Sequence, residues 1–394
     1  MNVLMIGAGD IARSHGRAVE KLDGKVIAAF DVNAAGLKRY CEEFNCEPIG
    51  YEELDAWIPK ADYVVLCTPP TKRLDYVEKV LSAHVPLYME KPVAVTLEDA
   101  QKLKQMEQQY DAKIIVGFAH RYRPAFQKLV ELVQSGKLGD PINVFDNRVG
   151  PGFGFRGSYF AASWRTDPKL ACGFTIESIS HEWNLLTALC GEFETMSANV
   201  WCTIDSLPTY DTNFSATMKI KKGGIATINA SWSSDLGANL KGYIGTKGTA
   251  FLKGRDMFEF DELTYKTADM PQAVTITYND SYKFNQDGVI FPIHEHFQDC
   301  LKNGTPICTP LDEGIKVLKL STLALESSRE HTEIILDDKD VNHGSERIDR
   351  AQKQSDRASY PGSGHDLESA ERTSRRLSVR CGLHGSLLLP LYEG

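Results

Sequence analysis

Residues 3–12 of the chain read Val-Leu-Met-Ile-Gly-Ala-Gly-Asp-Ile-Ala, an apolar run that leads directly into the motif G-x-G-x-x-A. A short apolar run ending in glycine predicts a buried strand, and the helical spacing of apolar residues over Ile11–Leu22 predicts a helix after it. Between them, Gly7 permits a tight turn, Gly9 lets a pyrophosphate approach the backbone, and Ala12 allows the helix to pack closely on the strand. The stretch therefore predicts the first strand, turn and helix of a dinucleotide-binding unit.

An acidic residue follows at the end of the next predicted strand, Lys25–Asp31. A carboxylate about 20 residues beyond the glycines accepts hydrogen bonds from both ribose hydroxyls of NAD and would repel the 2′-phosphate of NADP. The first helix, which begins near Asp10 and Ile11, would point its N-terminus at the phosphates. We predict NAD as the cofactor rather than NADP. The alternative is an ordinary tight turn with a surface aspartate, and the agreement of strand, helix and acid argues against it.

Further apolar runs and helical patterns alternate through the first 120 residues. The predicted strands are Asp62–Thr68, Pro86–Glu90 and Lys113–Phe118, and the predicted helices are Ala34–Phe44 and one that is capped by Thr96. Strands this apolar are buried on both faces, as in a parallel sheet with helices on each side. We therefore predict an α/β fold in which residues 1–120 form a Rossmann domain, a doubly wound parallel sheet that binds NAD.

The pattern changes from about residue 121, where the predicted strands alternate apolar and polar residues. These strands are Ile142–Val149, Thr195–Thr203, Asn213–Ile220 and Ile225–Trp232, and helices are expected at Arg121–Gln134, His294–Asn303 and Asp312–Arg329. Such alternation suits an open, mostly antiparallel sheet with one face covered. We predict a second α/β domain over residues 121–340. Residues 341–394 are polar and lack periodicity, so we expect a disordered tail there.

The composition narrows the class of protein. The chain has 394 residues, 42% of them hydrophobic, and a formal net charge of −9, which argues against a broad nucleic-acid surface. No apolar run approaches the ~18–20 residues of a membrane helix, and the N-terminus lacks the basic region of a signal peptide. The nine cysteines form no C-x-x-C pair. We therefore expect reduced thiols in a cytoplasmic protein with neither a membrane nor a nucleic-acid partner.

Two further motifs carry groups suited to acid–base chemistry. Glu90-Lys91-Pro92 follows a predicted strand at the carboxyl edge, where open α/β sheets bind ligands. Spacing alone slightly favours the alternative, a solvated charge pair beside a turn proline. Glu177 and His181 stand four positions apart in a predicted helix that runs to about Cys190, so they share a face and the carboxylate can orient the imidazole. A helix-face ion pair and a metal site are the alternatives. A third metal ligand is not evident, and we predict no metal.

Other aromatic and imidazole side chains have simpler interpretations. We expect His15, His84 and His331 on helix surfaces. We expect a set of tryptophans in the core: Trp57, Trp183, Trp201 and Trp232.

Taken together, these features resemble the Gfo/Idh/MocA family, the relatives of glucose–fructose oxidoreductase and inositol dehydrogenase. The resemblance covers about residues 1–337 and rests on residues 7–12, Asp31, Thr68-Pro69, Glu90-Lys91-Pro92, Gly117–Arg123, Trp164–Pro168, Glu177 with His181, and Ile244–Thr249. The combination is specific, whereas each motif alone is not.

The resemblance implies an NAD(P)-dependent dehydrogenase that transfers a hydride at a hydroxyl carbon of a sugar, a sugar derivative or a cyclitol. His181 would be the general acid/base, Lys91 would position the substrate and contact the cofactor side, and Glu177 would bind a substrate hydroxyl. The implied cofactor-binding residues are Gly7, Gly9, Asp10, Ile11, Asp31, Thr68, Pro69, Glu90 and Lys91. The implied substrate-binding residues are Lys91, Arg121, Tyr122, Arg165, Glu177 and His181. Family members carry the substrate site and often the oligomer interface on the second domain, which implies a homo-oligomer, a dimer or a tetramer.

The chain departs from the family pattern around this site. The family more often has aspartate at the position of Glu177, asparagine at Pro70 and histidine at Arg73. These changes keep the acid/base and the lysine but leave the identity of the substrate open. If neutral His181 takes the hydroxyl proton, oxidation should rise with pH through a transition near ~6.5.

Two other activities stay open at this stage. One is redox-neutral elimination or glycoside cleavage, in which bound NAD oxidises a sugar only transiently. The other is a regulator that senses the cofactor without turnover, because a fold alone does not establish a function.

Overall fold

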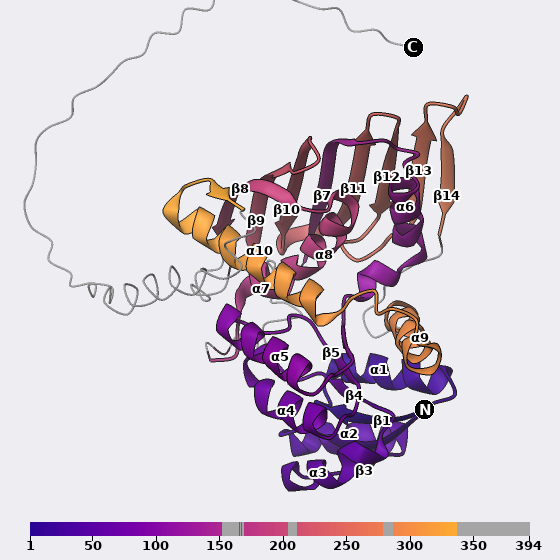
Figure 1. The fold of residues 1–394 in the computed structure, drawn as a ribbon, viewed down its shortest axis with the longest axis vertical. Helices are drawn as coiled ribbons and strands as arrows, with labels where there is room; N and C mark the ends of the chain where they lie inside the picture. The colour runs from indigo at the N-terminus through magenta and orange to yellow at the C-terminus, as the bar shows by residue number, and fades with distance from the viewer. Residues whose placement is uncertain (152–164, 166, 168, 204–210, 279–286, 337–394) are drawn as a thin grey trace, which may run out of the picture. The chain divides into compact units, whose positions relative to one another are not determined.

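The computed structural model of the chain describes residues 1–151, 165, 167, 169–203, 211–278 and 287–336. The predicted tail, residues 341–394, lies outside these ranges, and so does Trp164 of the motif Trp164–Pro168. Within the described ranges, no helix is both long and apolar enough to cross a membrane. Two β-sheets organise this part of the chain (Figure 1).

The first sheet is parallel throughout and has the strand order β3-β2-β1-β4-β5-β6. Its strands are β1 (Asn2–Ile6), β2 (Lys25–Phe30), β3 (Glu47–Pro48), β4 (Tyr63–Leu66), β5 (Leu87–Met89) and β6 (Ile114–Val116). Val3 and Met5 enter one hydrophobic cluster and Leu4 and Ile6 another, so β1 is buried on both faces. The predicted doubly wound Rossmann sheet is confirmed. The edge strand β3 was not predicted, because two residues are too few to show a pattern.

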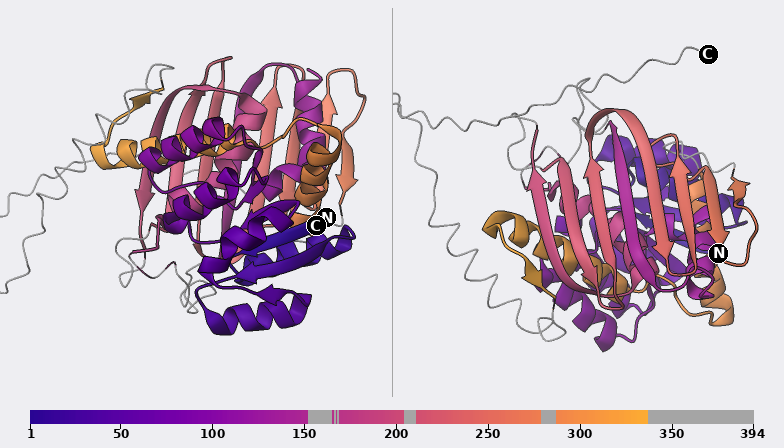
Figure 2. Two further views of the ribbon diagram at one scale, coloured as in Figure 1. Left: turned by 60° about the horizontal axis from the view of Figure 1, so that its bottom comes forward. Right: turned by 90° about the horizontal axis from the view of Figure 1, so that it is seen from above.

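Helices cover both faces of this sheet (Figure 2). They are α1 (Asp10–Lys21), α2 (Ala34–Phe44), α3 (Leu54–Trp57), α4 (Leu74–Ser82) and α5 (Leu97–Gln109), with 3-10 turns at Tyr51–Glu53, Ile58–Lys60 and Pro70–Lys72. Late in the chain, α9 (Asp287–Asn303) returns to this sheet and lies beside α1 (Figure 1). Its residues Ile293 and Phe297 belong to the same hydrophobic cluster as Val3. The Rossmann layer therefore contains a helix that the sequence places far beyond residue 120.

The second sheet has nine strands in the order β14-β13-β12-β11-β7-β10-β9-β8-β15. The strands are β7 (Pro141–Pro151), β8 (Phe193–Trp201), β9 (Asn213–Ile220), β10 (Ile225–Ser231), β11 (Ser233–Gly245), β12 (Gly248–Gly254), β13 (Glu262–Thr267), β14 (Val274–Thr277) and β15 (Ile334–Ile335). All neighbours are antiparallel except β7 and β10. Helices α6 (Pro124–Gln134), α8 (Ile179–Cys190) and α10 (Leu311–Glu330) lie against one face (Figure 2). The expectation of an open, mostly antiparallel sheet is confirmed.

Three predicted helices have different bounds. The helix expected from Arg121 begins at Pro124 and follows a 3-10 turn at Ala119–Tyr122, because proline suits the first helical position and disfavours helical backbone before it. The helix expected from His294 already begins at Asp287. The helix expected to run to Cys190 is broken at Ser178 into α7 (Gly173–Glu177) and α8.

Two side-chain predictions are wrong. Trp201 is 49% exposed, because it ends β8 on the side of the sheet that the helices leave open, whereas Trp183 and Trp232 are buried as expected. His15 is fully buried rather than on the surface, because α9 covers the face of α1 that carries it.

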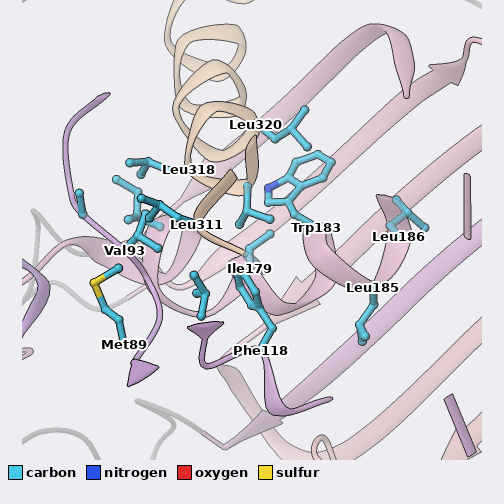
Figure 3. Close-up of a cluster of buried hydrophobic side chains, with 14 of the residues drawn as sticks. Met89, Val93, Phe118, Ile179, Trp183, Leu185, Leu186, Leu311, Leu318 and Leu320 are labelled. Carbon is cyan, nitrogen blue, oxygen red and sulfur yellow. The ribbon is translucent and has the colours of Figure 1, made fainter. Parts of the chain in front are cut away.

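The core between α8 and α10 joins the second sheet to the Rossmann domain (Figure 3). Trp183 and Ile179 of α8 lie against Leu311 and Leu320 of α10, and Met89 at the end of β5 belongs to the same cluster. Burying side chains of this size contributes roughly 1.5–3 kcal/mol each. This packing fixes α8 relative to the end of β5, where the site lies.

Candidate active site

The turn between β1 and α1 is shaped for close backbone approach. Gly7 has φ +94°, and a Cβ there would lie 2.8 Å from the Cys67 carbonyl carbon, so only glycine fits. A Cβ on Gly9 would meet nothing within 4 Å, which leaves the space in front of the turn open. No side chain caps the N-terminus of α1, whose free N–H groups favour an anion. These features fit the pyrophosphate of a dinucleotide.

The predicted ribose-binding acid lies beside this turn. Asp31 accepts hydrogen bonds from the backbone N–H of Ala8 at 2.6 Å and of Asn33 at 2.7 Å. Each carboxylate oxygen retains further acceptor capacity. Val32 next to it is 87% exposed and presents no cation.

A pocket opens at the carboxyl ends of β1, β4, β5 and β6, the edge where α/β sheets bind ligands. It is lined from the Rossmann side and from the second domain: the polar lining residues are Thr68, Arg73, Glu90, Lys91, His120, Arg165, Glu177, Ser178 and His181, and the apolar ones include Ile11, Pro69, Pro70, Trp232, Phe258 and Ile290. Predicted cofactor and substrate residues thus share one pocket.

The Lys91 ammonium crosses from the Rossmann turn to the second domain. Its Nζ donates to the carbonyl oxygen of Glu177 at 3.2 Å. That carbonyl is available because the helix breaks there: the N–H of His181 bonds to Ser178 instead of reaching back to Glu177. The hydroxyl of Ser180 donates to the same carbonyl at 2.7 Å. The break between α7 and α8 therefore anchors Lys91 one turn away from His181.

The Glu177 carboxylate is buried and ion-paired. Arg165 Nε donates to its Oε1 at 2.7 Å, and a second guanidinium nitrogen contacts the same oxygen. The sequence predicted that this carboxylate would orient His181, but its pairing with Arg165 is the interaction the structure shows. The pair presents both a donor and an acceptor to the pocket, which suits a substrate hydroxyl.

The His181 imidazole lies against a second histidine. The ring of His120 packs edge-on at 4.4 Å between centroids, and Phe118 lies at 6.3 Å. Burial, followed by the nearby charge of Lys91, holds the pKa of His181 well below its usual value. Its Nδ1 is buried without a hydrogen-bond partner in the structure. The ring is thus kept neutral near pH 7 and able to accept a proton.

Behind His181 lies a group of buried ion pairs. Arg148 donates to the hydroxyl of Ser178 at 2.8 Å and pairs with Glu182 at 2.6 Å. Lys241 pairs with Asp146 at 2.7 Å. Truncating one partner of a buried pair is strongly destabilising. The contacts of Arg148 connect β7 to Ser178 at the helix break and to Glu182 of α8.

Arg73 fixes the backbone on the Rossmann side of the pocket. Its guanidinium is buried and donates to the carbonyls of Thr68, Glu90 and Pro92. Burial lowers its pKa to about 10, so it stays charged near pH 7. Arg73 thereby holds both residues that flank Lys91.

The structure separates two predicted substrate residues from this pocket. Arg121 Nη1 points to the carbonyl of Asn184 at 3.4 Å, and the Tyr122 hydroxyl bonds to Thr309 at 2.9 Å; neither lines the pocket. His120, directly before them, does line it. The 3-10 turn at Ala119–Tyr122 decides which side chain faces inward. The sequence analysis included His120 in the Gly117–Arg123 motif but did not name it as a site residue, because it expected a helix from Arg121 and no turn before it.

The Rossmann side also holds an unsatisfied polar atom that a ligand would complete. Thr68 Oγ1 is buried at the pocket wall with no hydrogen-bond partner in the structure. Together with the open glycine turn and the free N-terminus of α1, this hydroxyl fits a bound nicotinamide dinucleotide. The described residues contain no group of three potential His, Cys, Asp or Glu metal ligands.

The parallel sheet with its glycine turn, joined to an open-sheet domain across one pocket, defines an oxidoreductase of the NAD-binding Rossmann class. Residues 1–118 match the model of the oxidoreductase family with an NAD-binding Rossmann fold, and residues 126–251 match the GFO/IDH/MocA C-terminal domain. The chain therefore belongs to the Gfo/Idh/MocA family, as its sequence predicted.

Curated relatives match part of the chain in sequence. It is 28% identical over 204 residues to an uncharacterised protein of Saccharomyces cerevisiae, a match that covers 50% of this chain and 58% of that protein. It is 27% identical over 137 residues to inositol 2-dehydrogenase of Rhizobium meliloti, which covers 34% of this chain and 41% of that enzyme. The chain thus spans about half the length of the curated relatives it matches.

Solved structures share the fold over more of the chain. Levoglucosan dehydrogenase in complex with NADH superposes with a TM-score of 0.75 at 16% identity, covering 86% of this chain and 99% of that one. The WlbA dehydrogenase of Bordetella pertussis, in complex with NADH and UDP-GlcNAcA, gives a TM-score of 0.71 at 20% identity over 85% and 98%. At these identities the likeness shows the fold.

Proposed function

We propose that the protein is an NAD-dependent dehydrogenase that oxidises a hydroxyl carbon of a sugar, a sugar derivative or a cyclitol. The observation that carries this proposal is the meeting of Lys91 and His181: the lysine reaches the Glu177 carbonyl at 3.2 Å, next to the histidine, at the carboxyl edge of a dinucleotide-binding sheet. A proton acceptor and a cation beside the nicotinamide end of such a sheet are what alcohol oxidation requires.

Each residue has a distinct task in this reaction. The bound nicotinamide supplies the hydride acceptor. Neutral His181 takes the proton of the substrate hydroxyl while the hydride leaves the carbon that bears this hydroxyl. The Lys91 ammonium stabilises the negative charge that develops on the hydroxyl oxygen. Glu177 and Arg165 hold a neighbouring hydroxyl and so orient the carbon that reacts.

The rest of the pocket wall favours a carbohydrate. Its polar groups can bind several hydroxyls, and Trp232 and Phe258 offer apolar surface to the C–H face of a ring. A levoglucosan dehydrogenase among the structural neighbours and an inositol 2-dehydrogenase among the sequence relatives support this substrate class. The Asp31 carboxylate supports NAD over NADP.

A screen of polyols and sugars tests the proposal. The purified full chain is mixed with NAD and each compound, and the absorbance of reduced nicotinamide is followed, with NADP and substrate-free reactions as controls. We expect stoichiometric NADH from at least one ring polyol or sugar. Substrate consumption without net NADH would contradict the dehydrogenase and favour redox-neutral chemistry. Nucleotide binding without turnover of any compound would favour a regulator.

A further inference from the structure

A buried chain of hydrogen bonds connects α9 to the pocket. Tyr63 OH lies 3.0 Å from His294 Nδ1, His294 Nε2 lies 2.7 Å from His15 Nδ1, and His15 Nε2 lies 3.2 Å from Glu90 Oε1. Tyr63, His15 and His294 are fully buried, whereas Glu90 lines the pocket. The dehydrogenase mechanism uses none of the three buried residues.

The direction of the hydrogen bonds follows from the acceptor at the end of the chain. A carboxylate only accepts, so His15 Nε2 carries a proton and donates it to Glu90. With neutral rings, His15 Nδ1 then accepts from His294 Nε2, and His294 Nδ1 accepts from the hydroxyl of Tyr63. Every donor in the chain thus points toward Glu90.

Glu90 receives a second hydrogen bond on its other oxygen, because the backbone N–H of Lys91 lies 3.2 Å from Oε2. Two N–H donors on two oxygens fix the orientation of the carboxylate. Among the described lining residues the acidic ones are Glu90 and Glu177, and Glu177 is paired with Arg165. Glu90 therefore supplies the negative charge on the Rossmann side, beside Lys91 and Arg73.

We propose that His15 and His294 are positioning residues that fix the Glu90 carboxylate at the pocket wall, and that its charge favours the oxidised, cationic nicotinamide over the reduced, neutral one. The inference rests on the proposed function only in that a nicotinamide dinucleotide occupies the pocket. Opposite charges attract more strongly away from bulk water. The Glu90 carboxylate would therefore stabilise the cationic ring of bound NAD⁺ more than the neutral ring of bound NADH.

The ratio of the dissociation constants of NADH and NAD⁺ measures this effect without turnover. Both constants are obtained by fluorescence titration of the purified full chain, with thermal melts to show that each variant is folded. Glu90→Gln removes the charge and should weaken NAD⁺ relative to NADH by about tenfold. His15→Phe keeps the ring volume but removes the donor, and should shift the ratio the same way by about three- to tenfold.

Two tyrosines provide a matched comparison around His294. Tyr63→Phe deletes the hydroxyl that starts the chain and should shift the ratio by about two- to threefold in the same direction. Tyr88 is equally buried and stacks on His294 at 4.7 Å between centroids, but its hydroxyl has no hydrogen-bond partner in the structure. Tyr88→Phe should therefore leave the ratio unchanged.

A double variant separates positioning from general damage to the fold. If His15 acts through Glu90, then His15→Phe should cause no further change of the ratio in the Glu90→Gln background. An unchanged ratio in His15→Phe and Tyr63→Phe, or an equal shift with and without Glu90, would overturn the inference and leave the dehydrogenase intact. Failure of the wild-type chain to bind either nucleotide would instead contradict the proposed function, and the inference with it.

Discussion

Two titratable groups of the pocket, His181 and Lys91, each have a pKa that their surroundings shift. Burial is the first cause for both, and it disfavours the charged form of each. For Lys91 the carboxylates of Glu177 and Glu90 oppose this lowering of the pKa, which keeps the ammonium available. For His181 the charges of Lys91 and Arg148 add to the lowering. One cation and one neutral base therefore coexist in a single pocket.

The lowered pKa of His181 gives a pH prediction that corrects the one made from the sequence. The base acts in its neutral form, which persists above its pKa, so kcat/KM for oxidation should stay level as pH falls through ~6.5 and decline only in more acidic solution. Initial rates across pH measure this, and each sample is returned to neutral pH to show that it has not unfolded. A half-point at or above ~6.5 would contradict the shift.

We expect the choice between NAD and NADP to depend on Asp31 and its exposed neighbour Val32. Replacing Asp31 with serine and Val32 with arginine removes the repulsion of a 2′-phosphate and adds a partner for it, so the preference for NAD over NADP should narrow or invert. The measurement is kcat/KM with each nucleotide, and Val32→Ala is the control. A wild-type chain that already prefers NADP would show that Asp31 does not have this role.

The sequence identified several residues that line the pocket, but it did not identify the contacts that these residues make. Glu90, Lys91, Glu177 and His181 do line one pocket, because motifs at strand ends reach the same sheet edge. The partners of these residues were not predictable. Whether Arg121 or His120 faces the pocket depends on a short 3-10 turn, for which the sequence pattern gives no period.

Among the secondary-structure elements, the break between α7 and α8 has the largest effect on the site. It exposes the Glu177 carbonyl for Lys91, and α7 itself is held by Asp211, which accepts from the Thr175 N–H at 2.7 Å. The sequence predicted one continuous helix here, because Ser178 is neither proline nor glycine. At the break, the Ser178 hydroxyl accepts a hydrogen bond from Arg148, a tertiary contact that local propensity does not contain.

Gly173, at the start of α7, offers a test of this element. Its φ is +79°, and a Cβ would lie 2.0 Å from an Asp211 carboxylate oxygen, so Gly173→Ala combines backbone strain with a clash. Gly136→Ala is the matched control, since Gly136 has φ +70° and open space around it. Positive φ costs either alanine roughly 1–2 kcal/mol, but only Gly173→Ala should also lower kcat/KM. Equal activity of the two variants would show that α7 does not set the site.

For the molecule as a whole, the open face of the second sheet carries exposed apolar side chains. Phe145 of β7 and Phe251 of β12 lie on it with ring centroids 6.1 Å apart across Gly242, and Ile225 of β10 is 49% exposed. Exposed apolar residues gathered on one face favour association. We propose that this face forms the interface of a homo-oligomer.

A charge on this face tests the oligomer. Phe251→Glu should shift the protein toward a monomer in sedimentation experiments at micromolar concentration, because an unpaired charge in an interface is costly. Val32→Glu, which alters an exposed apolar residue on the Rossmann domain, should leave the mass unchanged. A wild-type chain that sediments as a monomer would contradict the interface.

The order of the two domains along the chain was predictable from the sequence. The return of α9 to the first domain was not. Strand periodicity separates the apolar strands of the first sheet from the alternating strands of the second. The return of α9 to the Rossmann face depends on packing of Ile293 and Phe297, and it brings His294 to His15. A surface position for His15 was the natural prediction without knowledge of the helix that covers it.

We propose that Lys91 and His181, contributed by different domains, act together on one carbon. The test is hydride transfer by Lys91→Ala and His181→Ala, measured with the best substrate of the screen, with Lys38→Ala and His84→Asn as exposed controls. Removing an acid/base group typically costs about 10²–10⁴ in rate, and removing a donor that stabilises developing negative charge costs about 10²–10³, so both pocket variants should lose at least about 10² in kcat. The dissociation constant for NAD should stay nearly unchanged in His181→Ala. Near-normal turnover in either pocket variant would remove that residue from the mechanism.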